Sequence, residues 1–510
     1  MKKFLYIICV FFIVNTLVNA EDLCLSTMSG NINLPFLPEV TTMSDSVPPF
    51  WVDIVTSLPE GYVVDDQGNV EISTAEGLAW FISEVNGLNG CEPDNFKGRT
   101  VVLTNDINLS DSDIGVRRFT PIGNRNNPFM GIFDGCNHKI DGINILYRHH
   151  YGDSAVFDIG MFGYICNGTI KNVILNSGTL FVNDFLDEIY QYPQGSLVSF
   201  SDSLSVIDNC IVKLDLGFIN GGAVVGVNRN SIIRNCSYNF GGNVDFGING
   251  AGIVYLNLSE GGYANSEVLN CYFYGGLIGS YSVENQGGIV CFNETATNNN
   301  GKSAIIRNCH AKLLKDMYGF DYVGGIAGYN SEGSIMENCY ADITSVEHDI
   351  TLIGKNDGIF NNCSEYVVED DHCLLLDYVY VGEHKTNSLL DALNIWVDIQ
   401  DDPEIYQIWE IKNNGIPEFE GFYPSGITIE NSNFDNIVIY PNPSKDFINI
   451  KGLNGESTMS YSIYDMTGRL VLQGYISQNS EISISSLKDG IYVISIDVEK
   501  PIKSKFVKQR

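Results

Sequence analysis

The densest group of side chains that could bind a metal is the run Glu369-Asp370-Asp371-His372-Cys373, with Cys363 a short distance before it. Carboxylate, imidazole and thiolate groups are common metal ligands, but this spacing matches no zinc motif. An acidic loop, with or without a Cys363–Cys373 disulfide, explains the same residues. His149 and His150 also lack a third ligand nearby. We therefore expect no metal centre and no cofactor, and the sequence leaves calcium at scattered acids open.

Motifs of nucleophilic or phosphate chemistry are missing from the sequence, because GxSxG, HExxH and Walker A patterns are all absent. A polysaccharide lyase or hydrolase would need acidic or basic side chains that face one another across an exposed strand surface. The Gly-rich segments of the chain carry almost no ionisable groups. The sequence therefore favours a binding or structural role over an enzyme.

Asp184, Tyr190 and Tyr192 are candidate ligand-binding residues, in a segment over 181–194 that mixes acidic and aromatic side chains. Aromatic rings can stack on sugars, and carboxylates accept hydrogen bonds from hydroxyl groups. The same tyrosines could equally anchor the loop to the protein. The segment remains a candidate binding loop on these grounds.

These residues must be positioned by a repeat that fills the middle of the chain. An Asn-Cys dipeptide recurs at intervals of 26, 35, 38, 30 and 24 residues, and a Gly-rich segment precedes most copies. Short β-branched or aromatic runs bounded by Gly and Asn turns favour strands, which stack as a β-helix or β-solenoid. Asn172-Val173 fits the same position, with Val in place of Cys. The copies are Asn209-Cys210, Asn235-Cys236, Asn270-Cys271, Asn308-Cys309, Asn338-Cys339 and Asn362-Cys363.

The two residues of the dipeptide have different expected roles. Cysteine is a small apolar side chain, so we expect the six cysteines to stack inside the coil, mostly as free thiols. We expect the asparagines to stack at a turn and to exchange amide hydrogen bonds between coils. The charged residues before some asparagines, Asp208 with Arg234 and Arg307 with Glu337, would form ion pairs between adjacent coils.

Short helices and two insertions complete the expected repeat domain. Ser73 to Glu76 is a capping-box pattern followed by apolar residues at helical spacing, which predicts a helix over the first coil. The segment Ser388 to Val397 predicts a second helix that caps the far end. Insertions at 257–266 and 293–303 should emerge on the same side of the coil, where they are free to bind a ligand.

Composition and the start of the chain indicate the compartment. The 510 residues include 62 acidic against 29 basic side chains, a net charge of −33, which argues against a nucleic-acid partner. Lys2 and Lys3, an apolar run and small residues predict a secretory signal peptide that is cleaved between Ala20 and Glu21. No later stretch has eighteen consecutive apolar residues, so we expect no transmembrane segment in the mature chain.

The segment Gly324 to Ala341, which reads GGIAGYN and then GSIMENCYA around Ser331 and Glu332, resembles the GLUG repeat of bacterial surface proteins. The pattern from Ser73 to Trp80 is similar to the start of the same family, and the resemblance extends over 71–420. Several copies depart from it, with Ala, Ile or Val where the family favours Leu. The resemblance implies surface exposure and no particular reaction.

The C-terminal portion, 435–510, reads as a small all-β domain of alternating strands and turns. It closely resembles the type A C-terminal sorting domain of the type IX secretion system of Bacteroidetes. The resemblance implies that the domain directs the protein across the outer membrane and is usually removed, often with attachment to surface lipopolysaccharide. The residues that carry it are Tyr440, Pro441, Asn442, Pro443, Asp465, Gly468, Arg469, Gly490, Tyr492, Lys503, Lys505 and Lys508.

Together these features predict an all-β protein: a signal peptide (1–20), a lead segment (21–70), a β-solenoid with short capping helices (71–420), a linker (421–434) and a C-terminal β-sandwich (435–510). It should be exported through the periplasm and outer membrane and be secreted or held at the cell surface. Expected partners are the type IX machinery, lipopolysaccharide as an anchor, and a glycan or a host or surface protein. We expect an adhesin-like binding scaffold. The alternatives are a β-helix polysaccharide lyase or hydrolase and a purely structural surface protein.

Overall fold

The structure of the protein is a computed structural model, rich in strands and poor in helices. The residues that it describes are 49–110, 117–148, 158–183, 193–279, 284–314, 317, 321–342, 350–363, 366–369, 372–411, 417–419, 438–440, 444–445, 447–451, 459–465, 470–476, 481–485, 487–488, 490–497 and 502–508.

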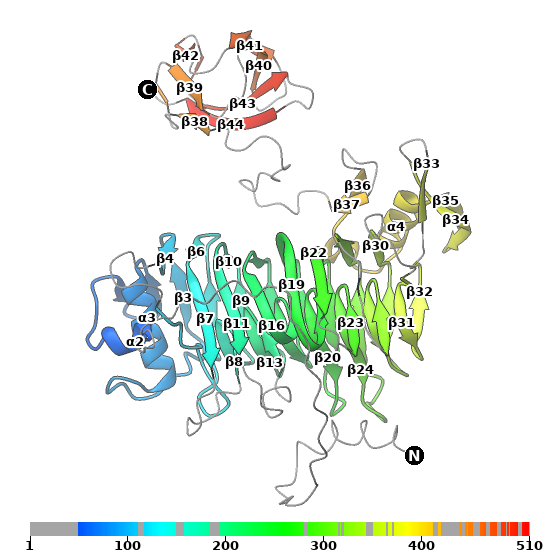
Figure 1. Ribbon diagram of the computed structural model, residues 1–510, viewed down its shortest axis with the longest axis horizontal. Coiled ribbons are helices and arrows are strands. Elements are labelled where there is room, and N and C mark those ends of the chain that lie inside the picture. Colours follow the sequence, from blue (N-terminus) through cyan, green and yellow to red (C-terminus); the bar gives the residue numbers. More distant parts are fainter. Residues whose placement is uncertain are drawn as a thin grey trace, which may run out of the picture.

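Three sheets of mainly parallel strands surround one apolar core between residues 62 and 363 (Figure 1). Sheet 1 contains β1 (Tyr62–Val64), β2 (Val70–Ile72), β3 (Thr100–Leu103), β5 (Ile132–Asp134), β9 (Thr169–Lys171), β14 (Val206–Asp208), β18 (Ile232–Arg234), β21 (Ser266–Leu269), β25 (Ala304–Arg307), β29 (Ile335–Glu337) and β32 (Ile359–Asn361). Only β1 pairs with its neighbour in the antiparallel direction among these strands.

The other two sheets follow the same order along the chain. The main path of sheet 2 contains β4 (Ile107–Asn108), β6 (Lys139–Asp141), β10 (Ile174–Leu175), β15 (Ile211–Val212), β19 (Ser237–Ala251), β22 (Tyr272–Gly279), β26 (His310–Leu313) and β30 (Tyr340–Asp342). Six more strands lie beside it: β7 (Ile143–Arg148), β11 (Gly178–Asn183), β12 (Gln194–Gly195), β16 (Asp215–Gly222), β23 (Asn285–Gly287) and β27 (Tyr322–Gly324). Sheet 3 contains β8 (Phe162–Cys166), β13 (Val198–Asp202), β17 (Val225–Arg229), β20 (Val254–Ser259), β24 (Val290–Thr295), β28 (Ala327–Asn330) and β31 (Ile353–Asn356).

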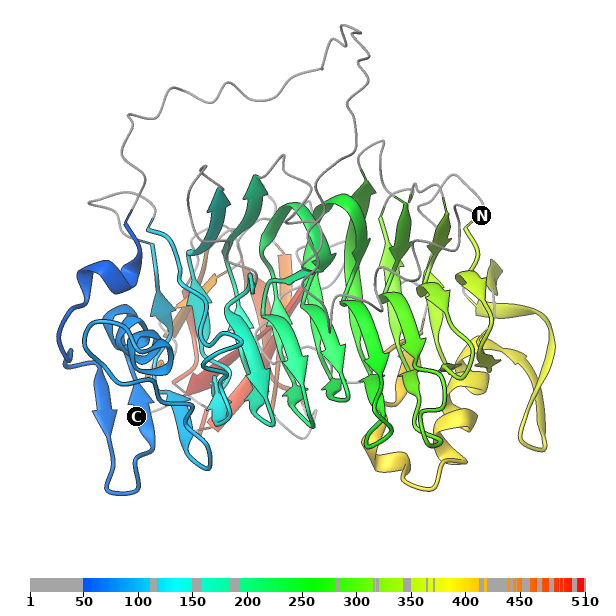
Figure 2. The ribbon, with the colours of Figure 1, turned by 90° about the horizontal axis from the view of Figure 1, so that it is seen from below.

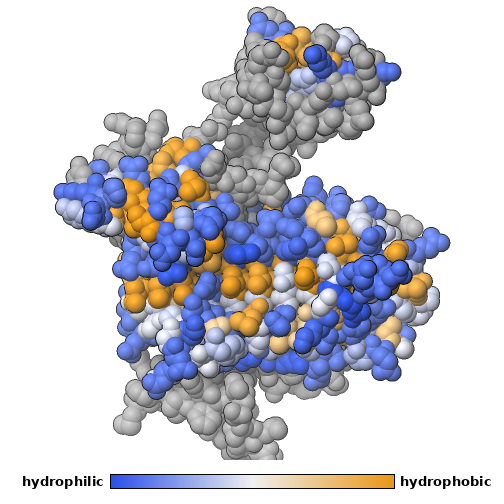
Figure 3. Space-filling view, turned by 180° about the vertical axis from the view of Figure 1, so that it is seen from behind, coloured by the Kyte–Doolittle hydropathy of each residue, from blue (hydrophilic) through white to orange (hydrophobic). Residues whose placement is uncertain are grey.

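Successive strands of one sheet come from successive coils of the chain, and side chains at matching positions therefore form columns. One column of sheet 1 points inward and is fully buried over six coils: Ile170, Ile207, Ile233, Val268, Ile306 and Met336. Such parallel stacking is consistent with the expected β-helix or β-solenoid. From behind, the coils show a largely hydrophilic surface with a band of hydrophobic residues across it (Figure 3).

The helix α3 (Ala75–Asn86) covers the first coils, as its sequence predicts. Thr74 begins the helix, and its hydroxyl accepts a hydrogen bond from the backbone N–H of Gly77 at 3.1 Å. Phe81 is fully buried and packs edge-on against Phe96 and Phe129, at centroid distances of 5.1 and 5.8 Å. The apolar face of α3 thus becomes part of the central core, at one end of the stack (Figures 1 and 2).

The prediction that a second helix caps the far end of the stack is wrong, because α4 (Leu389–Asp398) lies against the side of the stack. Its buried residues form a separate cluster with Tyr272 and Tyr340, which lie on sheet 2 and offer an apolar surface there. Phe360, in the last coil, is 37% exposed, whereas Met336 before it in the same column is fully buried. The described residues therefore leave the end of the central core partly open.

The chain after the last coil adds short antiparallel elements. They are β33 (Tyr366–Glu369), β34 (His372–Val381) and β35 (His384–Ser388) before α4, and then the 3-10 helix η2 (Pro403–Ile405), β36 (Trp409–Ile411) and β37 (Pro417–Phe419). A four-residue helix, α2 (Trp51–Ile54), stands near the start of the described chain.

The C-terminal portion has two antiparallel sheets and its own core. One sheet contains β38 (Val438–Tyr440), β39 (Phe447–Lys451) and β42 (Glu481–Ser483); the other contains β40 (Met459–Asp465), β41 (Leu470–Ile476), β43 (Gly490–Asp497) and β44 (Ile502–Lys508). Alternate residues of these strands fill the core, which includes Ile448, Ile463, Ile482 and Ile494. This arrangement is the one that a small β-sandwich requires.

Candidate functional site

The asparagines of the Asn-Cys repeat lie on a left-handed turn, where a side-chain amide tolerates positive φ. Their φ angles fall between 46° and 54°. We call Asn172, Asn209, Asn235, Asn270, Asn308, Asn338 and Asn362 the first asparagine ladder. The Nδ2–Oδ1 distances are 2.7 Å for Asn209–Asn172, 3.0 Å for Asn270–Asn235, 2.8 Å for Asn308–Asn270, 2.7 Å for Asn338–Asn308 and 2.6 Å for Asn362–Asn338.

The six repeat cysteines are buried in a column beside this ladder. The sulfur atoms of Cys309, Cys339 and Cys363 each accept a hydrogen bond from the backbone N–H one coil earlier, at 3.4, 3.4 and 3.2 Å. All ten cysteines that the structure reports are free thiols, which excludes a Cys363–Cys373 disulfide. Burial raises the pKa of the Cys236 and Cys363 thiols, so these groups are poor nucleophiles and serve as core packing.

The charged residues beside the ladder form the expected ion pairs between coils. Arg234 bonds Asp208 through Nε and Nη2 at 2.9 and 2.7 Å, and Arg307 Nε lies 2.7 Å from Glu337. The Arg234 side chain is 41% exposed, so solvent screens its ion pair. Pairs of this kind contribute roughly 0–1 kcal/mol each and help to fix register.

A second asparagine ladder, which sequence reasoning missed, runs across the strands of sheet 3, near the end of each strand. Its members are Asn228, Asn257, Asn293, Asn330 and Asn356, linked by Nδ2–Oδ1 bonds of 2.7 to 2.8 Å. The first four are fully buried. The missed pattern is an Asn three residues after the first strand residue in each Gly-rich copy, as in Val225-Gly226-Val227-Asn228.

The segment that contains α4 and the residues after it forms hydrogen bonds with asparagine side chains of the first ladder. Asn270 Nδ2 donates to the Ile405 carbonyl at 2.8 Å, and Trp409 Nε1 donates to Asn308 Oδ1 at 2.7 Å. Leu393 and Ala392 offer carbonyls to the last two asparagines of the ladder in the same way. The asparagine side chains of this part of the ladder are therefore bound by other residues of the same chain.

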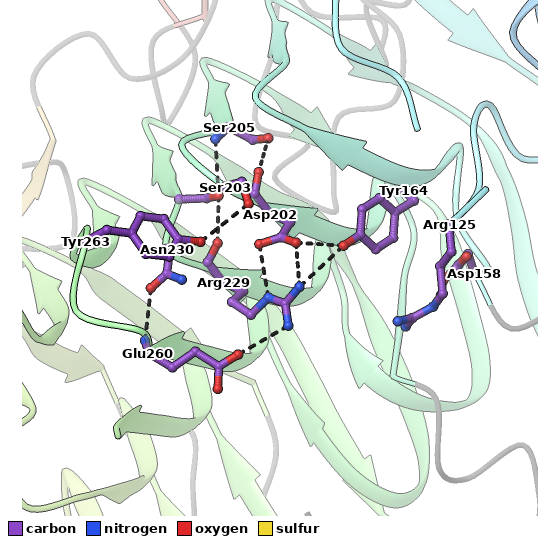
Figure 4. Close-up of polar contacts among 11 residues, drawn as sticks. Arg125, Asp158, Tyr164, Asp202, Ser203, Ser205, Arg229, Asn230, Glu260 and Tyr263 are labelled. Atoms are coloured by element: carbon purple, nitrogen blue, oxygen red, sulfur yellow. Dashed lines mark hydrogen bonds and ion pairs between the residues drawn. The ribbon is translucent and has the colours of Figure 1, made fainter. Parts of the chain in front are cut away.

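A polar cluster on the outer face of sheet 3 joins side chains from four coils (Figure 4). We call Tyr164, Asp202, Arg229 and Glu260 the Arg229 cluster. Arg229 lies beside Asp202 in the strand register, and its Nε donates to Asp202 Oδ1 at 3.0 Å. Its Nη1 donates to Glu260 Oε1 at 3.2 Å, and the Tyr164 hydroxyl donates to Asp202 Oδ2 at 2.7 Å.

The protonation states of this cluster follow from its contacts. Burial opposes the charge on Asp202, but hydrogen bonds from Arg229 and Tyr164 outweigh it and hold the Asp202 pKa below its ordinary value. Burial and the bond to Asp202 raise the pKa of Tyr164. Asp202 is therefore a carboxylate and Tyr164 a neutral phenol near pH 7, and neither group exchanges a proton there.

The rings beside the cluster stack on one another. Tyr164 and Phe200 are 5.0 Å apart with planes inclined by 7°, and the Arg125 guanidinium lies 4.9 Å from the Phe200 centroid. Arg125 also pairs with Asp158 at 3.3 Å. Because ring faces meet each other and a cation, these aromatic residues offer little free ring face to a sugar.

An exposed rim adjoins the Arg229 cluster where sheet 3 turns towards sheet 1. We call Leu204, Glu260 and Tyr263 the Tyr263 corner; Leu204 is 59% and Tyr263 53% exposed. Tyr263 belongs to the insertion after β20, and Figure 4 shows it beside Ser203, whose hydroxyl lies 3.4 Å from the Tyr263 hydroxyl.

The two expected insertions contact one another, which confirms that they emerge on the same side of the coils. Gly262 N donates to Asn299 Oδ1 at 2.6 Å, and Ser303 N donates to Asn265 Oδ1 at 3.1 Å. The loop that carries Tyr263 is therefore braced by the next insertion.

Several predicted residues lie outside the described part of the chain. They are Ala20, Glu21, His149, His150, Asp184, Tyr190, Tyr192, Asp370, Asp371, Pro441, Asn442, Pro443, Gly468 and Arg469. Of the sorting-domain residues, Tyr440 lies on β38, Asp465 on β40, Gly490 and Tyr492 on β43, and Lys503, Lys505 and Lys508 on β44.

Two side-chain contacts to backbone carbonyls stabilise this domain, one before β43 and one at the end of the last strand, β44. The Tyr492 hydroxyl donates to the Lys488 carbonyl at 2.9 Å, and the buried Lys508 donates through Nζ to the Lys445 carbonyl. Lys508 is thus part of the fold and not a free charge on the tail.

The described residues contain neither a metal-binding cluster nor a helix that could span a membrane. No group of three or more His, Cys, Asp or Glu side chains is arranged to hold a metal ion among them. The helices within the described ranges are too short or too polar to cross a membrane.

Comparison with known proteins identifies the C-terminal portion. No curated protein has a sequence that matches this chain. Residues 438–509 match the family model of the secretion system C-terminal sorting domain, which covers β38 through β44. The chain therefore carries a type IX sorting domain and is a protein that this system secretes or anchors at the cell surface.

Proposed function

We propose that the chain is an adhesin-like surface scaffold of a bacterium of the Bacteroidetes, built as a GLUG-like β-helix that binds a glycan or a protein. The sorting domain supports delivery to the surface, with lipopolysaccharide as the anchor after the domain is removed. The three stacked sheets support a rigid rod that displays loops. Insertions between the strands then carry the binding function.

The observation that carries this proposal is the contrast between the coils and the insertions. Asparagines of the second ladder bond one another, and the repeat cysteines are buried, so the side chains at these recurring positions are used for packing and hydrogen bonds within the fold. The Tyr263 corner, in contrast, presents an exposed ring beside a charged cluster. A purely structural surface protein would not need such an exposed group.

The enzymatic alternative has two candidate acids on or near this face, Asp158 and Glu294, and Asp158 is paired with Arg125. Burial raises the pKa of Glu294, a change typical of a general acid. The strand register, however, places Glu294 three coils from Asp202. At ~4.8 Å per coil this separation is about 14 Å, beyond the ~9.5 Å that glycoside hydrolysis allows between its two carboxyls.

Two measurements on the full chain test the proposal. Export is tested in the native host by deletion of 435–510, and we expect the truncated protein to stay in the periplasm; normal surface display would contradict the routing. Binding is tested on a glycan array and on intact cells with the secreted protein. Retention without product supports a scaffold, whereas release of a new reducing end or an unsaturated uronate would establish the enzyme instead.

A further inference from the structure

We propose that the Tyr263 corner is a binding site for neutral pyranose units of a polysaccharide. The inference rests on the proposed function, because it names the ligand class of a surface that the scaffold displays. It draws on four features of the corner: its bracing, its exposed apolar surface, its free hydrogen-bond acceptor and its charge.

The loop that carries the corner is held in one conformation from both sides. Gly261 and Gly262 have φ angles of 71° and 69°, which favour glycine, and the Tyr263 ring packs over Gly261. A Cβ at Gly261 would lie 3.3 Å from Tyr263 Cε1. With the contact from Gly262 to Asn299, the ring is oriented before any ligand arrives, and ordering it costs little on binding.

The apolar part of the corner is the exposed Tyr263 ring, whose hydroxyl lies 3.4 Å from that of Ser203, the residue before the exposed Leu204. Tyr263 is not stacked against another aromatic ring within the described residues, unlike Tyr164 and Phe200. Leu204 stands two residues from Asp202 and is 59% exposed. The C–H face of a pyranose is an apolar surface of matching size, and aromatic rings are suited to cover it.

The polar part of the corner is the Glu260 carboxylate. Its Oε1 accepts a hydrogen bond from Arg229 at 3.2 Å, and no described residue donates to its Oε2. The backbone N–H of Glu260 donates to Asn230 Oδ1 at 2.9 Å, which fixes where the side chain starts. The side chain is 34% exposed, so Oε2 can accept a hydrogen bond from a ligand hydroxyl.

Charge decides between neutral and acidic sugars. Asp202 and Glu260 together carry two negative charges against one positive charge on Arg229, in a chain of net charge −33. All three guanidinium nitrogens of Arg229 already donate to Asp202 or Glu260. A uronate or sulfated sugar would therefore meet repulsion and would find no free guanidinium edge.

A lysine or arginine side chain of a protein partner is the competing occupant, since it also combines hydrogen-bond donors with affinity for an aromatic ring. Arg229 Nη1 lies 3.2 Å from Glu260 Oε1, so its positive charge repels a second cation at this carboxylate and offsets part of the attraction from the surplus negative charge. A pyranose needs only the acceptor and the ring, both of which the corner supplies.

The test uses the secreted full chain in affinity gels and calorimetry against four probes: a neutral β-glucan, a neutral mannan, polygalacturonate and a lysine-rich peptide. We expect binding to at least one neutral polymer, with an affinity that stays roughly constant up to about 0.5 M salt because no charge is neutralised. Tyr263→Ala should weaken it by about tenfold, equivalent to ~1.4 kcal/mol. Glu260→Gln, which keeps an acceptor oxygen, should weaken it only a few-fold.

Tyr380→Ala is the matched control, because Tyr380 is 71% exposed on β34, away from the corner. It should leave binding unchanged, and all variants should melt at the wild-type temperature. Wild-type affinity in Tyr263→Ala would overturn the corner as the site while leaving the scaffold function intact. Binding only to polygalacturonate, or a salt-sensitive preference for the peptide that Glu260→Gln abolishes, would overturn the ligand class. Failure of every probe would overturn this inference, whereas the routing tested by deletion of 435–510 would stand.

Discussion

Asn235 donates its side-chain hydrogen bond to Asp208 at 2.8 Å and thereby interrupts the first asparagine ladder. Asn172, the first member of that ladder, likewise donates to an aspartate, Asp134, at 2.9 Å, whereas Asn209 and the asparagines from Asn270 onward each bond the asparagine one coil earlier, as Asn270 does to Asn235 at 3.0 Å. Asp208 also pairs with Arg234, so one carboxylate accepts bonds from two adjacent residues of the next coil. Asp208 therefore links two adjacent coils through its side chain.

Replacement of Asp208 tests this role. We expect Asp208→Ala to lower the free energy of unfolding by about 1–3 kcal/mol, because it removes an ion pair and leaves the Asn235 amide without its acceptor. Thermal melting of the full chain measures the effect. Lys171→Ala is the control, since it removes only the half-exposed ion pair to Asp134; its effect should be within about 1 kcal/mol. If both variants lowered the free energy of unfolding by the same amount, the hydrogen bond from Asn235 to Asp208 would add no stability beyond that of an ion pair.

The second asparagine ladder should matter more for stability than the first. Asn293 is fully buried, accepts from Asn257 at 2.7 Å and donates to Asn330 at 2.8 Å. Asn293→Ala would leave the Asn330 Oδ1 without its donor and remove one acceptor from Asn257 Nδ2, which keeps the Ser266 and Ile305 carbonyls; we expect a cost of about 1–3 kcal/mol. The exposed Asn209 is the matched site, and Asn209→Ala should cost about 1 kcal/mol or less. The reverse order in chemical denaturation would contradict this assignment.

The open end of the core predicts a gradient of mutational cost along one column. Met336 is fully buried, whereas Phe360, the next residue in the column, is 37% exposed. Met336→Ala should destabilise by about 2–5 kcal/mol. Phe360→Ala should cost less despite its larger side chain, and proteolysis kinetics of the two variants compare them directly. A larger effect at Phe360 would mean that the last coil is covered in solution.

Sequence reasoning reached the stacked strands because the Asn-Cys spacing is regular enough to define one coil. It missed the second ladder because those asparagines follow a Gly-rich segment. Gly and Asn together are typical of turns, so the pattern did not indicate that these asparagines lie on strands. It placed α4 at the open end because the amphipathic pattern predicts a helix with one apolar face but does not indicate which surface of the protein that face covers. Tyr272 and Tyr340, against which α4 packs on the side of sheet 2, come to lie on either side of His310 only when the coils are in register.

The Arg229 cluster was beyond sequence reasoning for a related reason. Tyr164, Asp202, Arg229 and Glu260 share no motif, and the insertions between them differ in length. Only the strand register brings them together, since Asp202 pairs with Arg229 on neighbouring strands. The expectation that insertions emerge on one side was nevertheless correct, because it depended on their position within the repeat and not on their length.

The buried cysteines should resist modification in the native protein. All six repeat cysteines are buried, so the reagent cannot reach their sulfur atoms, and burial also raises the pKa of the Cys236 and Cys363 thiols. Cys136 is exposed and serves as the control within the same sample. Iodoacetamide at pH 8 should label Cys136 and leave the six repeat cysteines unlabelled, as read by peptide mass spectrometry. Full labelling after denaturation without reductant should follow; labelled repeat cysteines in the native state would contradict the buried column.

The pH dependence of stability should report the Arg229–Asp202 pair. Because the folded-state pKa of Asp202 is below its ordinary value, its contribution is present above the unfolded pKa of about 3.9 and is lost as the pH falls through the folded value. Asp202→Asn should therefore melt below wild type at pH 7, and the difference should shrink at pH values below about 3.9 as the wild-type carboxylate becomes protonated. Asp66→Asn, at an exposed site, should follow the wild-type curve throughout. If the difference in melting temperature between Asp202→Asn and wild type stayed constant into acid, the charge of Asp202 would not be what stabilises the fold.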